Sequence, residues 1–114
     1  DNFQFSGTAA NTTTNRDILT DYTSGTEKLV FSKAVYGGFI TNPTSSITSA
    51  QLVQSSSFTA FTATSQRFGY NSTSGILYFD ADGSGSRFST QQVAVLGTLT
   101  HPSSLATSDF SLIA

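Results

Sequence analysis

The 114-residue chain contains no cysteine, no methionine and no tryptophan. Without cysteine it cannot form disulfides, use a thiol nucleophile, or bind zinc or iron–sulfur clusters through thiolates. The single histidine, His101, excludes a site with several histidine ligands. A chain of this length is expected to form one domain over residues 1–114, and packing alone must hold its core.

Charge is also scarce. Charged residues make up 11% of the chain, and five Lys and Arg stand against seven Asp and Glu. This composition lacks the basic surface that binds phosphate backbones, so we expect no nucleic-acid partner. The longest apolar runs are four residues, as in 76–79 and 93–96. Since a helix needs roughly 20 apolar residues to cross a bilayer, we expect no membrane span.

Hydroxyl and aromatic side chains are abundant instead. Serine and threonine account for 37 residues, and there are ten phenylalanines and four tyrosines. Threonine and aromatic residues favour pleated, half-buried surfaces, and bulky rings fill the space between sheets. The composition therefore predicts a mostly-β fold, either an antiparallel β-sandwich-like domain or a β-roll cap, with one to three short helical turns.

Period-2 alternation of apolar residues predicts strands at 3–5, 28–31 and 110–113. Three segments are less definite. Residues 32–39 are compatible with a helical turn before Gly37, and 102–110 with another. Residues 49–53 are compatible with either a short helical piece or an edge strand, and the sequence does not decide between them.

The pattern is sharpest in the second half. Residues 67–70, the loop 71–75 and residues 76–79 predict a β-hairpin, and a loop of turn formers then leads to a strand at 91–96. These segments form a predicted three-stranded antiparallel meander. Because residues 76–79 are apolar on both faces, we expect a second layer to cover this central strand.

Four segments resemble, in order, the C-terminal part of RTX (hemolysin-type calcium-binding) proteins. Residues 17–32 are similar to D-x-I-x-D-F-x-x-G-x-D-x-L-x-L-S, with Tyr22 and Glu27 as departures. Residues 67–85 resemble R-x-x-Y-x-x-x-x-G-x-L-x-Y-D-x-D-G-x-G, and residues 105–110 resemble L-T-x-x-D-F. Residues 1–5 look like the end of a last G-G-x-G-x-D-x-U-x repeat. No complete repeat is present.

The resemblance implies a non-catalytic C-terminal domain that follows the calcium β-roll of a secreted, extracellular bacterial protein. Its expected partners are the upstream β-roll and a type I secretion transporter, which would recognise an uncleaved C-terminal signal. We expect no cleavable N-terminal signal. The strand at 3–5 would continue the roll, and its exposed edge could support self-association. The parent protein could be a secreted peptidase or lipase.

Asp80, Asp82 and Ser84 are the first candidate metal ligands. Oxygen donors at alternate positions before a glycine match the first half of an EF-hand-like Ca²⁺ loop. The twelfth position is Gln91, where an EF-hand has a bidentate glutamate, and no helices flank the loop. The alternative, which the sequence favours, is that these residues only form a turn.

Asp1, Asp17 and Asp21 form a second candidate group. The resemblance implies that acids near the last repeat help to close a final calcium turn, although the glycine-rich residues before Asp1 are missing here. In the alternative, which is again favoured, Asp17 and Asp21 cap strand ends or pair with Arg16 and Lys28.

The sequence gives little support for catalysis. No G-x-S-x-G motif is present, and His101 precedes a proline in an expected loop. The main rival function is an adhesin-like or glycan-binding β-sandwich whose loops bind the ligand. Its candidate stacking residues are more simply explained as core; they are Phe58, Phe61, Phe68, Tyr70, Tyr78 and Phe79.

Overall fold

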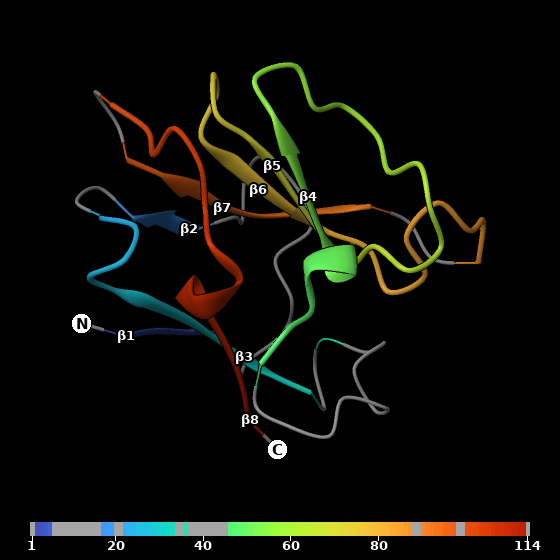
Figure 1. Ribbon diagram of the computed structural model, residues 1–114, viewed down its shortest axis with the longest axis horizontal. Coiled ribbons are helices and arrows are strands. Elements are labelled where there is room, and N and C mark those ends of the chain that lie inside the picture. Colours follow the sequence, from blue (N-terminus) through green and yellow to red (C-terminus); the bar gives the residue numbers. More distant parts are fainter. Residues whose placement is uncertain are drawn as a thin grey trace.

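The computed structural model describes residues 2–5, 17–19, 22–33, 36, 46–87, 90–97 and 100–113, which form two β-sheets and two short 3₁₀ turns (Figure 1). The strands are β1 (Asn2–Phe5), β2 (Asp17–Leu19), β3 (Lys28–Ser32), β4 (Leu52–Ser55), β5 (Phe68–Asn71), β6 (Ile76–Phe79), β7 (Gln91–Leu96) and β8 (Phe110–Ile113). The prediction of a mostly-β fold with one to three helical turns is confirmed.

One sheet is entirely parallel, and the other is mixed. The parallel sheet has the order β1-β3-β8, and the mixed sheet has the order β2-β7-β6-β5-β4. The predicted antiparallel meander is confirmed as β5-β6-β7. The other described pairs, β1 with β3, β2 with β7, β3 with β8 and β4 with β5, are parallel.

The prediction of antiparallel pairing therefore holds for the meander but not for the other strand pairs. The lengths of the connections between the strands explain the difference. A short turn such as Asn71–Gly75 can join only antiparallel neighbours, whereas parallel neighbours need a long crossover. Residues 56–67 supply such a crossover between β4 and β5. Alternation of side chains marks a strand but carries no information on the direction of its neighbour.

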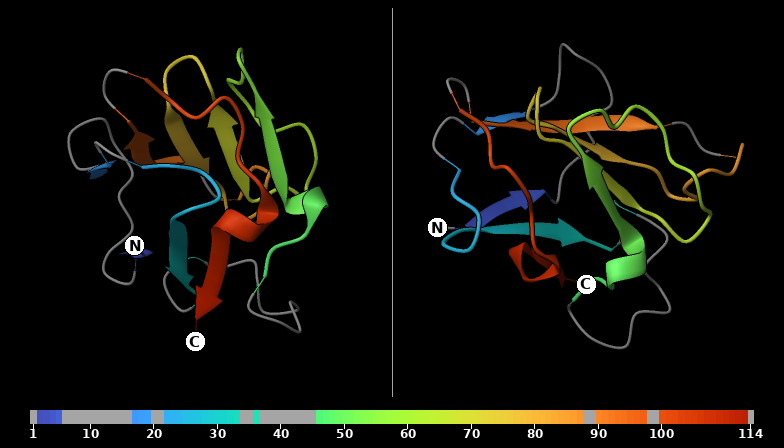
Figure 2. Two further views of the ribbon diagram at one scale, coloured as in Figure 1. Left: turned by 60° about the vertical axis from the view of Figure 1, so that its left-hand side comes forward. Right: turned by 45° about the horizontal axis from the view of Figure 1, so that its top comes forward.

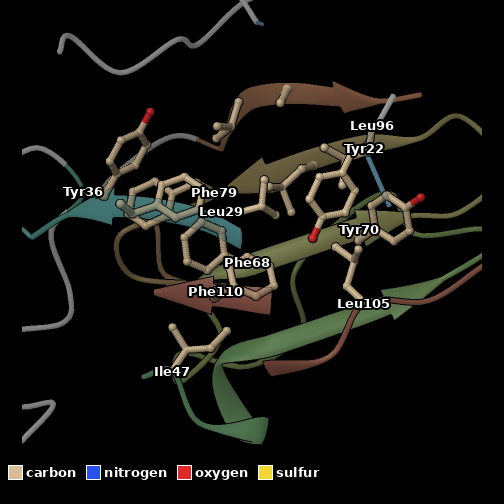
Figure 3. Close-up of a cluster of buried hydrophobic side chains, with 14 of the residues drawn as sticks. Tyr22, Leu29, Tyr36, Ile47, Phe68, Tyr70, Phe79, Leu96, Leu105 and Phe110 are labelled. Atoms are coloured by element: carbon tan, nitrogen blue, oxygen red, sulfur yellow. The ribbon is translucent and has the colours of Figure 1, made fainter. Parts of the chain in front are cut away.

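The two sheets face each other, as Figure 2 shows from two sides. One cluster of buried apolar side chains, many of them aromatic, fills the space between them. Phe31 of the parallel sheet lies 4.6 Å from Phe68 of the mixed sheet, measured between ring centroids. Phe110 of β8 lies 4.8 Å from the same Phe68 ring. Figure 3 shows Phe68 and Phe110 packed with Leu29, Tyr36 and Phe79 between the layers. Burial of such rings is the main stabilising contribution in a chain without disulfides.

A smaller cluster covers the outer face of the mixed sheet. The Phe58 ring lies over Gly69, where an added Cβ would come within 2.2 Å of it, and packs 5.4 Å from Tyr78. Ile76 and Tyr78 are only half-buried, whereas Leu77 and Phe79 are buried. The central strand is thus covered on both faces as predicted, but less completely on the outer face, where one loop replaces a second sheet.

This arrangement also answers the question of the stacking residues. Five of the six candidate aromatics are buried, and Tyr78 is half-buried under Phe58. A flat sugar-stacking platform needs exposed ring faces, so these residues are core, as the sequence favoured.

The short helical turns resolve two of the open segments. Residues 49–53 combine both alternatives, because the 3₁₀ turn η1 (Ser49–Gln51) leads directly into β4. The turn expected within 102–110 is η2 (Thr107–Asp109). In the segment 32–39, the Tyr36 N–H donates to the Ser32 carbonyl at 2.8 Å, and the remainder lies largely outside the described residues. No helix in the described part of the chain is long and apolar enough to cross a bilayer.

Candidate functional site

The loop that follows β6 begins with a buried carboxylate. Asp80 is 3% exposed. Its Oδ1 accepts a hydrogen bond from the Asp82 N–H at 3.2 Å, and its Oδ2 accepts one from the Thr90 hydroxyl at 2.8 Å. The first bond makes a local turn, and the second joins the two ends of the loop just before β7.

The rest of the loop folds back on a neighbouring segment. Asp82 Oδ2 accepts from the Arg87 N–H at 3.0 Å, and the Ser84 N–H donates to the Ala63 carbonyl at 3.2 Å. Gly83 has φ +60°, and a Cβ there would lie 2.3 Å from the same Ala63 oxygen. Only glycine fits this conformation and this close approach.

The two acids of this loop, Asp80 and Asp82, lie close enough to affect each other's charge. Burial and the neighbouring Asp82 carboxyl raise the pKa of Asp80, and the hydrogen bond from Thr90 only partly opposes this shift. Carboxylate oxygens are among the donors that Ca²⁺ prefers.

Of the six predicted ligands, the structure brings together Asp80 and Asp82. The Ser84 side chain is exposed. The backbone of Asp17, in β2, pairs with that of Ala94 in β7. The side chain of Asp17 lies outside the described residues, and so do Asp1 and Asp21. Within the described ranges no group of three His, Cys, Asp or Glu side chains gathers around a common point. Thr90 was missed by the sequence analysis because a threonine before a strand carries no distinctive signal.

A second buried carboxylate lies at the opposite end of the core. Asp109 is 1% exposed and accepts three hydrogen bonds, from the Ser24 hydroxyl at 2.6 Å, the Gly25 N–H at 2.8 Å and the Ala106 N–H at 2.8 Å. It therefore ties the turn before β3 to the C-terminal segment. The sequence marked Asp109 only as part of the L-T-x-x-D-F resemblance and did not predict this role.

A pocket of about 430 Å³ opens beside this carboxylate. The turn before β3 lines one side and the segment before η2 lines the other; the lining residues are Tyr22, Thr23, Ser24, Thr100, His101, Pro102, Ser103 and Ser104. His101 Nδ1 lies 2.8 Å from the Leu96 carbonyl oxygen. Because a carbonyl only accepts, Nδ1 carries the hydrogen of this bond.

Comparisons with protein families, with curated proteins and with solved structures found no match to this chain.

Proposed function

We propose that this chain is the non-catalytic C-terminal cap of a longer, secreted hemolysin-type calcium-binding protein, placed directly after its β-roll. The observation that carries the proposal is the position of β1. This strand lies at the edge of an entirely parallel sheet and pairs with β3 on one side. A β-roll is built from parallel strands, so its last strand can add to such an edge.

The cap has a physical purpose. The end of a solenoid leaves unpaired N–H and C=O groups and an apolar cross-section, which an atypical terminal unit must cover. Here β3 and β8 continue the parallel pairing beyond β1, and the mixed sheet covers their apolar face through Phe31 and Phe110. The parallel pairing ends at β8, the other edge strand of this sheet.

Export of the protein would use the C-terminal residues before they fold. Asp109, Phe110 and Leu112 are at most 2% exposed in the folded domain. A type I transporter that recognises these side chains must therefore contact the unfolded chain. The domain would then fold outside the cell, which gives it an extracellular location.

Joining the chain to a β-roll tests the cap. We expect a fusion of glycine-aspartate nonapeptide repeats to residue 1 to remain monomeric and to unfold in one transition with this domain. The separate chain should self-associate through β1, with an apparent mass in sedimentation that rises with concentration. A fusion that unfolds in two independent transitions would contradict the proposal.

Secretion tests the second part. A passenger carrying these 114 residues at its C-terminus should appear in the medium of a host with a type I transporter. The same host without the transporter is the control for lysis. Retention of the passenger in the transporter-bearing host would show that the chain does not carry the export signal.

Calcium binding at the loop after β6 is the third part of the proposal. Asp80 and Asp82, which lie close together in this loop, would supply carboxylate oxygens. The ion would reduce the repulsion between these two carboxylates. The Asp80→Asn and Asp82→Asn double variant keeps the shape of both side chains and removes their charge.

We expect excess Ca²⁺ to raise the melting temperature of the natural sequence and not that of the double variant. At a hundredfold excess over Kd the gain is about 2.7 kcal/mol. Ser84→Ala, which changes an exposed side chain of the same loop, should keep most of the response. If the double substitution changes the melting temperature equally in Ca²⁺ and in chelator, calcium does not bind at this loop.

A further inference from the structure

Both walls of the His101 pocket are held in place before any ligand arrives. On one side, the Thr23 N–H donates to Glu27 Oε1 at 2.6 Å, and Ser24 is bound to Asp109. On the other, the Tyr70 hydroxyl donates to the Pro102 carbonyl at 2.7 Å. Figure 3 shows Tyr22 and Tyr70 side by side at this end of the core. A pocket with fixed walls loses little conformational entropy when it binds.

The segment beyond His101 is held by a side-chain amide that makes two hydrogen bonds to its backbone, as a neighbouring strand would. Gln54 of β4 accepts from the Leu105 N–H and donates to the Leu105 carbonyl, both at 2.7 Å. The imidazole itself rests on Gly75, where a Cβ would come within 2.2 Å of Nδ1. The ring therefore has one defined position, and its Nδ1 is committed to Leu96.

The lining is rich in hydroxyl groups and has no fixed charge. Thr23, Thr100, Ser103 and Ser104 are exposed, and none of the lining residues is Asp, Glu, Lys or Arg. Each hydroxyl can donate and accept, and the His101 imidazole adds a further polar group. This set suits a ligand that presents several hydroxyl groups. The volume also lies within the range of roughly 300–1,000 Å³ that is usual for small-molecule sites.

The charge behind the walls selects against anions. Asp109 lies directly behind Ser24, and Glu27 lies behind Thr23. Burial and these two carboxylates raise the pKa of Tyr22, and burial raises the pKa of Tyr70 to about 12. Both phenols therefore stay neutral near pH 7, and the local potential is negative. A phosphate, sulfate or carboxylate would be repelled.

We infer that this pocket binds a neutral saccharide through the hydroxyls of Ser103 and Ser104, the His101 imidazole and the turn at Thr23. The inference goes beyond the proposed capping and export function and does not depend on it. It adds a ligand site on the face formed by the ends of the parallel and mixed sheets.

The test begins with an array of neutral and anionic mono- to tetrasaccharides, followed by titration of the ¹⁵N-labelled chain with a neutral sugar that binds. We expect neutral sugars to bind and to shift the amide signals of His101 and Ser103. Ser103→Ala with Ser104→Ala should weaken binding at least tenfold. The matched control, Ser56→Ala with Ser57→Ala, changes exposed serines elsewhere and should leave binding unchanged.

A second variant, Ser104→Trp, fills the pocket and should abolish binding while the rest of the amide spectrum stays folded. The inference is overturned if no neutral sugar binds, if only anionic sugars bind, or if the serine pair at 103 and 104 and the control pair weaken binding equally.

Discussion

Asp80 and Asp109 are both buried carboxylates, yet their surroundings differ. Asp109 accepts three hydrogen bonds from two separate segments, and its partners are hydroxyl and N–H donors. Asp80 accepts two, and its neighbour is a second acid, Asp82. A buried charge is tolerated when donors surround it and is costly beside a like charge. Asp109 therefore joins two segments of the fold, whereas the Asp80 loop is the cation site that we propose.

The largest expected effect comes from removing the better-satisfied acid. Asp109→Ala leaves three donors without an acceptor and should lower the free energy of unfolding by about 3 kcal/mol. Asp109→Asn keeps one acceptor oxygen and should cost less. Urea unfolding measures both. If Asp109→Ala costs no more than Asp80→Ala, the contrast between the two acids is wrong.

The second prediction compares a glycine near each acid. Gly83 and Gly25 both have positive φ, but a Cβ at Gly83 would meet the Ala63 carbonyl, and a Cβ at Gly25 would meet nothing within 4 Å. Gly83→Ala should cost about 2–3 kcal/mol, and Gly25→Ala about 1 kcal/mol. Thermal unfolding of the two variants decides the order. Equal losses would mean that the loop after β6 yields to the added methyl group.

The third prediction concerns the donor that closes the Asp80 loop. Thr90→Val removes the hydroxyl that donates to Asp80 Oδ2 and should cost about 1 kcal/mol. Since this bond lowers the pKa of Asp80, its loss should raise that pKa further. Titration of the Asp80 carboxyl carbon by NMR measures the change. A lower pKa in the variant would contradict the proposed role of Thr90.

The smallest expected effect is a pH dependence confined to the Asp80 loop. The folded pKa of Asp80 lies above its ordinary value of 3.8, so the folded chain binds more protons between these values than the unfolded chain does. The contribution of this group to stability is therefore present at low pH and is lost as the pH rises through the folded pKa.

Asp80→Asn should remove the decrease in the free energy of unfolding that Asp80 causes as the pH rises. In the natural sequence, Ca²⁺ should reduce the same decrease, because the bound ion stabilises the ionised carboxylate. Ser84→Ala, an exposed and non-titratable position of the same loop, is the matched control and should leave the slope in place. Unfolding measured from pH 4 to pH 7 tests all three. The interpretation fails if Asp80→Asn keeps the natural slope.

Much of the fold could be predicted locally. The apolar runs in 76–79 and 93–96 and the turn at 71–75 were enough to predict the three strands of the meander, because neighbours joined by short turns are also neighbours in space. The parallel pairs could not be predicted in the same way, since β1, β3 and β8 are far apart in the chain.

The residues of the candidate site differ in the same way in how far they could be predicted. Asp80 and Asp82 could be recognised because both belong to one loop, and Thr90 could not because only the hairpin register brings it to Asp80. The pairing of Asp109 with Ser24 spans 85 positions. No sequence feature near Asp109 or near Ser24 predicts that the two residues are in contact.

Local sequence was enough to predict the β class, the core phenylalanines and the places where the chain turns, because these depend on side-chain type and on neighbours a few residues away. The three-dimensional packing was needed to learn which carboxylate is surrounded by donors, which one faces another acid, and which hydroxyls share a pocket with His101. The physical reason is that burial, charge and hydrogen bonding at a point depend on every segment that packs there, and those segments meet only when the two sheets close.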